Sequence, residues 1–212
     1  MGVSQELASW ISLSPIEIAE PPIIGKLAPS CPKLFLPAEN NKPTIVAFLR
    51  HCEFHVFMLT RVVYSYHEVA EASFLAMRKA AAQQPDINFI SISHSDQQST
   101  EKWLEAVGGS SEKGSSESVS VVVDADREVY ARWGLGTVSW GHVLNPLGIL
   151  AILKMGKETG IWNRPTESGS RWQGSGHWAV DAEGYVRWGG PATTAVDVID
   201  ITGALDALQI SH

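Results

Sequence analysis

Cys52 is the residue of this sequence best placed to carry out chemistry. It follows Arg50 and His51 and comes shortly after an apolar run at residues 44–49. Neighbouring positive charge and a helix N-terminus both favour the thiolate, which is the nucleophilic form of cysteine. Glu53 acts in the opposite direction, because a carboxylate disfavours a second anion beside it. Two interpretations follow: a reactive thiolate, or an inert cysteine buried at the end of a strand.

The second cysteine, Cys31, precedes the apolar run. Either it resolves an oxidised Cys52, which requires the two Cα atoms within about 7 Å, or it is a free cysteine of the N-terminal region. His51 and His55 are one helical turn apart beside Cys52, which suggests a metal site. No second His or Cys pair with ligand spacing follows, so we expect no metal. The chain also lacks a P-loop and a complete dinucleotide fingerprint, so we expect no cofactor.

Charge and cysteine content narrow the possible partners. The 212 residues carry 16 Lys and Arg against 23 Asp and Glu, a formal net charge of −7. Binders of nucleic acids and membrane surfaces need clustered positive charge, so we expect neither partner. No apolar run reaches the roughly 18–20 residues that cross a bilayer. Two cysteines cannot build a disulfide framework, which predicts a reducing, cytoplasmic setting.

Predicted strands and helices alternate in a way that positions Cys52 at one edge of a sheet. Unbroken apolar runs predict buried strands at residues 44–49, 87–92 and 119–123. Periodicity and capping predict helices at residues 54–84, 95–107, 126–133, 142–157 and 197–208. Residues 178–180 and 185–188 predict an antiparallel hairpin with Gly184 at a positive φ. Reactants gather at the carboxyl ends of the strands in such sheets, which is where Cys52 falls.

This order predicts an α/β, thioredoxin-like fold: a central mixed sheet flanked by helices, with a terminal β-hairpin and helix. Residues 1–42 are rich in proline and predict an irregular N-terminal arm with one short helix near residues 6–12. The thioredoxin-like domain is expected over 43–212, with a flexible loop at 108–118. Tryptophans concentrate between Trp133 and Trp188, where they either line an apolar pocket or pack against the sheet.

Six segments carry a resemblance to a known family: residues 48–52, 91–96, 123–127, 160–166, 170–173 and 180–184. In these segments the sequence resembles the peroxiredoxin-like branch of the alkyl-hydroperoxide-reductase and thiol-specific-antioxidant superfamily. Within that branch it is most similar to a group of fungal thioredoxin-fold proteins. The resemblance implies the thioredoxin-like fold and an antioxidant, thiol-dependent oxidoreductase activity.

By position, the resemblance makes Cys52 the peroxidatic or redox thiol. Arg171 is then the arginine that holds the thiolate and polarises the peroxide, with Arg50 as the alternative. The implied partners are a small-molecule peroxide and a thiol or disulfide partner of the thioredoxin or glutathione type. A homodimer is compatible with the resemblance.

The sequence departs from this family at the reactive cysteine. Members of the group continue from the His-Cys pair into a second Cys followed by Pro and Phe, whereas Glu53 follows Cys52 here. Leu49 stands at the threonine position of the Thr-x-x-Cys-Pro motif. Residues 54–69 are interpreted as an insertion. The alternative hypothesis is therefore a non-catalytic thioredoxin-fold binding or accessory protein, for example of a fungal small-molecule pathway, that has lost the Cys-Pro motif.

Overall fold

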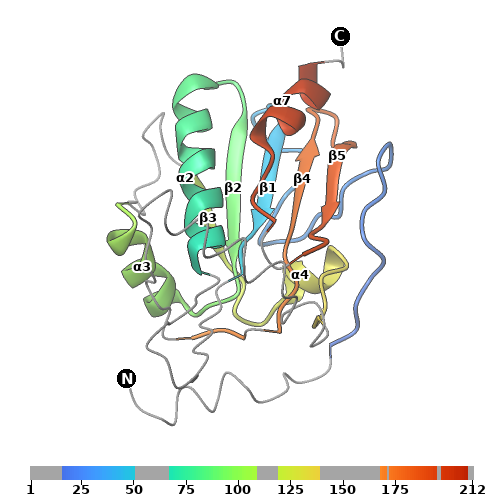
Figure 1. Cartoon of the computed structure of the whole chain (residues 1–212). Coiled ribbons are helices and arrows are strands. Elements are labelled where there is room, and N and C mark those ends of the chain that lie inside the picture. The colour runs from blue at the N-terminus through green and yellow to red at the C-terminus, as the bar shows by residue number, and fades with distance from the viewer. Residues whose placement is uncertain are drawn as a thin grey trace.

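The computed structural model describes residues 16–50, 67–108, 119–138, 168–170, 172–194 and 197–209. Its centre is a five-stranded sheet with the order β3-β2-β1-β4-β5 (Figure 1). The strands are β1 Thr44–Phe48, β2 Asn88–Ser93, β3 Ser120–Val123, β4 Gly176–Val180 and β5 Val186–Pro191. β1, β2 and β3 are parallel, β4 is antiparallel to β1, and β5 is antiparallel to β4. The predicted mixed sheet with a terminal hairpin is confirmed.

Helices cover this sheet. Those within the described residues are α2 His67–Gln83, α3 Gln97–Ala106, α4 Glu128–Arg132 and α7 Ile201–Gln209. α2 and α7 pack on the same face (Figure 1). α2 buries Ala70, Phe74, Met77 and Ala81, a helical spacing that gives it one apolar side. No helix of the described segments is both long and apolar enough to span a membrane.

The central strand β1 is buried along its whole length. Ile45 and Ala47 belong to the core under α2 and α7, whereas Val46 and Phe48 belong to the core on the opposite face. Both faces of β1 are thus covered, which explains why its sequence is an unbroken apolar run rather than an alternating one.

The core on the opposite face joins α4 to the N-terminal arm. The Phe48 ring packs against Trp133 and Trp178, with ring centroids 5.3 Å and 5.4 Å away. The arm contributes three buried residues to this core: Cys31, Leu34 and Leu36. Trp133 and Trp178 therefore pack against the sheet, the second of the two roles considered for the tryptophans.

Two predicted features are wrong. α7 begins at Ile201 rather than at residue 197, because the Asp197 carboxylate accepts hydrogen bonds from the preceding threonines and Asp200 accepts the Gly203 N–H at 3.0 Å. The third strand was expected to be buried, yet Ser120 is exposed and the rest of β3 is half-buried. The reason is that β3 forms an edge of the sheet.

Other predictions fall outside the described residues. These are the helices expected at residues 6–12 and 142–157, most of the expected insertion (54–66) and nearly all of the expected flexible loop (109–118).

Candidate functional site

The candidate site lies where the carboxyl ends of β1 and β2 meet the start of β4. β1 and β2 are parallel neighbours, and Phe48 at the end of β1 pairs with Gly176 at the start of β4. The residues directly after β1 and β2 therefore lie beside those directly before β4. Arg50 follows β1 at this edge and is only 5% exposed. Open α/β sheets bind their ligands at this edge.

Tyr130 of α4 holds the two strand ends together. Its buried hydroxyl lies 2.6 Å from the Leu49 carbonyl oxygen and 2.8 Å from the Ile92 carbonyl oxygen, and shares its one proton between them. The Ile92 carbonyl also accepts the Leu49 N–H at 2.9 Å. Buried carbonyl groups without a donor are costly. Tyr130 therefore stabilises the backbone at the point where the site begins.

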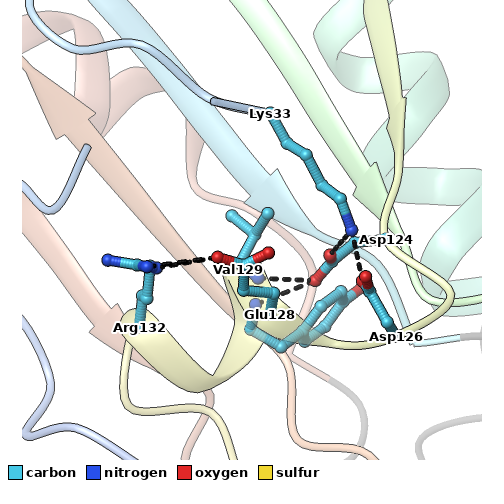
Figure 2. A network of polar contacts seen from close by, with 7 residues as sticks. Lys33, Asp124, Asp126, Glu128, Val129 and Arg132 are labelled. Atoms are coloured by element: carbon cyan, nitrogen blue, oxygen red, sulfur yellow. Dashed lines mark hydrogen bonds and ion pairs between the residues drawn. The ribbon is translucent and has the colours of Figure 1, made fainter. Parts of the chain in front are cut away.

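α4 is in turn held by Asp124, a fully buried carboxylate (Figure 2). Its Oδ2 accepts the N–H groups of Val129 at 2.8 Å and Tyr130 at 3.1 Å, and its Oδ1 lies 2.9 Å from Lys33 Nζ. Lys33 also pairs with Asp126. Burial raises the pKa of Asp124, while the Lys33 ammonium lowers that of Asp126. A cation from the arm thus offsets the cost of a buried carboxylate.

His94 follows β2 and is buried beside Tyr130, with the ring centroids 5.6 Å apart. Its Nε2 donates to the Ser170 carbonyl oxygen at 3.1 Å. Burial lowers the pKa of His94 to about 4, and the nearby Arg50 charge acts in the same direction, although the Ser170 and Leu49 carbonyls oppose it. At neutral pH the imidazole is therefore uncharged and adds nothing to the positive charge of Arg50.

The segment before β4 is fastened to the residues that follow β2. The Ser95 hydroxyl donates to the Ser168 carbonyl oxygen at 2.9 Å, and the Asp96 N–H donates to the Ser168 hydroxyl at 2.9 Å. Gly169 has a φ of +106°, and a Cβ at this position would lie 3.0 Å from His94 Nε2. Only glycine meets both conditions without strain.

Gln173 anchors the other side of the same segment. It is 1% exposed, and its Nε2 donates to the Leu135 carbonyl oxygen at 2.8 Å. The Gly174 N–H donates to the Gly136 carbonyl oxygen, also at 2.8 Å. Residues 168–170 and 172–174 are thus held between the end of β2 and the chain that follows α4.

A small polar hollow lies beside Arg50 on the α2 side of the sheet. Polar side chains around it are Arg50, Ser73, Ser175, His177 and Asp197. Its volume of about 10 Å³ is close to the least that one water molecule requires. Burial lowers the pKa of His177 to about 4, and Asp197 offsets part of this effect. The hollow thus brings together a guanidinium, a neutral imidazole and a carboxylate.

Of the residues predicted to carry the chemistry, the structure describes Arg50, whereas Cys52 and Arg171 lie outside the described residues. Arg50 is placed at the expected edge, where it lines the hollow and its charge acts on His94. Cys31 is a free cysteine, 6% exposed, within the core beside α4. Among the described residues, no three His, Cys, Asp or Glu side chains gather as metal ligands would; His51 and His55 lie outside them.

Four residues of the site were missed by the sequence interpretation: His94, Tyr130, His177 and Asp197. A signal existed for His94, a polar residue directly after a predicted strand. His177 lines the same hollow as Arg50 because β4 pairs with β1, with His177 opposite Ala47. No local sequence pattern predicts the pairing of β1 with β4, since the two strands are far apart in the sequence.

The sheet order, the helices and the polar edge define a protein of the thioredoxin-like fold. Among solved structures, the chain is similar to a thiol peroxidase from Chromobacterium violaceum, with a TM-score of 0.53 and 15% identity over 92% of this chain and 90% of that one. It is also similar to a peroxiredoxin-like protein from Aquifex aeolicus, with a TM-score of 0.51 and 11% identity over 91% and 90% of the two chains. No family model and no curated protein matches the sequence. At these identities the likeness establishes the fold alone.

Proposed function

We propose that this chain is a thiol-dependent oxidoreductase of the peroxiredoxin-like type, with Cys52 as its reacting thiol. The observation that carries the proposal is the buried Arg50 at the carboxyl end of β1, beside His94 and the start of β4. Cys52 comes two residues after Arg50 in the sequence. The fold shared with a thiol peroxidase and a peroxiredoxin-like protein supports the same conclusion.

In the proposed reaction, the Cys52 thiolate attacks the terminal oxygen of a hydroperoxide. The S–O bond forms as the O–O bond breaks, which gives a sulfenic acid and an alkoxide that takes a proton from water. A thiol then condenses with the sulfenic acid and releases water, which gives a mixed disulfide with Cys52. A second thiol attacks the outer sulfur of this disulfide, forms a new disulfide with the first thiol, and releases the Cys52 thiolate. Positive charge beside the sulfur favours the thiolate throughout.

Arg50 and Arg171 are the candidates for supplying that charge. The Arg50 guanidinium is buried, so its field is weakly screened. Ser170, directly before Arg171, is held near the end of β2 by His94, and Gln173, two residues after Arg171, is held to Leu135 in the chain that follows α4. This supports Arg171 as the second guanidinium of the site.

The proposed family group, reductant and cellular location are based on the sequence. The fungal peroxiredoxin-like group is supported by the six motif segments, and a thioredoxin- or glutathione-type reductant by the implied sulfenic acid chemistry. A cytoplasmic location follows from the low cysteine content. Homodimer formation and an antioxidant role are parts of the same proposal.

The pKa of the Cys52 thiol tests the proposal directly. In a Cys31→Ala background Cys52 is the single thiol, so its alkylation rate by iodoacetamide against pH gives its pKa. We expect a value well below the ordinary value of about 8.5, and a return toward it in urea. Peroxide consumption with a thiol reductant should be lost in Cys52→Ser. A folded-state pKa at or above 8.5 would contradict the proposal.

Conservative substitution separates charge from packing at Arg50. Arg50→Lys keeps a cation and should retain part of the lowered thiol pKa, whereas Arg50→Met should lose it. Arg171→Lys and Arg171→Met provide the matched pair at the second position. If none of the four changes the alkylation profile, neither arginine acts on the thiol.

The second candidate is a non-catalytic thioredoxin-fold binding protein. It is favoured by Glu53, which stands directly after Cys52 where the resembled group has its second cysteine. For this candidate we expect a Cys52 that resists alkylation in the folded protein and reacts only after unfolding. The same pH series therefore distinguishes the two functions.

A further inference from the structure

A second, larger hollow runs along β5 on the other side of His177. Its volume is about 490 Å³, and it is a shallow hollow that is largely open to solvent. His177 and Asp197 line both this groove and the small hollow beside Arg50. The two hollows therefore share these two residues. We refer to the larger hollow as the β5 groove.

Two glycines of β5 contribute no side chain to the groove, which leaves it open. Gly189 has a φ of +105°, and a Cβ there would lie 1.9 Å from the His177 carbonyl oxygen, so this position requires glycine. A Cβ on Gly190 would meet no atom within 4 Å, and its φ is one that other residues adopt. Gly190 therefore faces open space that a larger side chain would fill without strain.

The imidazole ring of His177 is available to form a hydrogen bond with a ligand. Its side chain is only 8% exposed, and among the described residues its ring makes no hydrogen bond. Buried polar groups normally have a partner. With its pKa lowered to about 4 by burial, the ring is neutral at pH 7, so one nitrogen donates and the other accepts.

The charged groups of the groove are acidic. Asp197 and Asp200 line it, and none of the lysines or arginines that the structure describes does. Burial opposes ionisation of Asp197, but hydrogen bonds from Thr193 and Thr194 nevertheless lower its pKa. The walls also present apolar surface from Ile24, Trp188 and Val198.

We propose that the β5 groove is a binding site for a small organic amine with an apolar body. The ammonium group would lie toward Asp197 and Asp200, the apolar body would pack against Trp188 and Ile24, and a polar atom of the ligand would hydrogen-bond to His177. An anionic ligand of the same shape is disfavoured by the two carboxylates. This site is separate from the proposed chemistry of Cys52 and does not depend on it.

A matched pair of probes tests the proposal on the full chain. Tryptamine and indole-3-propionate share a ring and a chain length but carry opposite charges, and their binding is followed by ligand-observed NMR titration. We expect tryptamine to bind at least about tenfold more tightly, a difference of about 1.4 kcal/mol. Equal binding of the two probes, or no binding of tryptamine, overturns the proposal.

Variants then locate the site. Gly190→Leu fills the groove and should weaken tryptamine binding at least about tenfold, and Asp200→Asn removes one carboxylate while keeping an acceptor for Gly203. Glu183→Gln is the control, because it removes the same charge from an exposed position in the hairpin turn. If Gly190→Leu fails to fold, the Asp200→Asn and Glu183→Gln pair decides. Equal tryptamine affinity in that pair places the amine elsewhere and overturns the proposal.

Discussion

Two buried histidines should make the stability of this protein fall steeply between about pH 6.5 and pH 4. Burial lowers the pKa of both His177 and His94 from 6.5 to about 4. In this interval the unfolded chain takes up protons that the folded chain does not, so the free energy of unfolding decreases as the pH falls. A difference of about 2.5 in pKa corresponds to roughly 3 kcal/mol for each histidine. Domains of this kind have only about 5–15 kcal/mol in total.

The His177→Gln variant isolates the contribution of one ring, because glutamine is polar but does not titrate. Urea unfolding followed by tryptophan fluorescence gives the free energy of unfolding at pH 7.5 and at pH 5. Between these values the wild-type protein should lose about 2 kcal/mol through His177 alone. The variant should therefore lose about 2 kcal/mol less than the wild type, whatever its stability at pH 7.5. The same loss in both proteins would refute the buried, neutral state of His177; His94→Gln serves as an independent second measurement.

Three further substitutions test the support of the site by urea unfolding at pH 7.5. Tyr130→Phe removes a donor from the Leu49 carbonyl and one of the two donors of the Ile92 carbonyl, which keeps the Leu49 N–H. It should cost about 1–3 kcal/mol, with no change expected if the hydroxyl bonds to water instead. Lys33→Met leaves Asp124 buried without its cation and should cost about 1–3 kcal/mol; a cost that does not shrink at low pH would contradict the ion pair. Gly169→Ala should cost at least about 1 kcal/mol, since it combines a positive φ with the close approach of His94, and a neutral effect would refute that strain.

Much of the fold could be predicted because its signals are local. β1 is an apolar run because both of its faces are covered. α3 begins where Asp96 can accept the Ser99 N–H, which it does at 2.8 Å. The hairpin turns at Gly184, whose φ of +90° is one that glycine adopts readily. Each of these features is decided by a few neighbouring residues.

The site was less predictable because contacts between distant segments build it. The sequence places Arg50 after a strand, but only the pairing of β1 with β4 brings His177 beside it. The start of α7 was placed too early for a similar reason. Asp197 binds the N–H groups of Thr193 and Thr194, so its carboxylate stabilises a turn and faces His177 instead of beginning a helix.

The N-terminal arm helps to hold α4 in place beside this site, although residues 16–42 contain no regular helix or strand. Its Ala19 N–H donates to the Ala131 carbonyl oxygen at 3.0 Å, and its Lys33 neutralises Asp124 at the start of the same helix. α4 in turn presents Tyr130 to the ends of β1 and β2. These contacts form a continuous series from the arm, through α4, to the carbonyl of Leu49, the residue directly before Arg50.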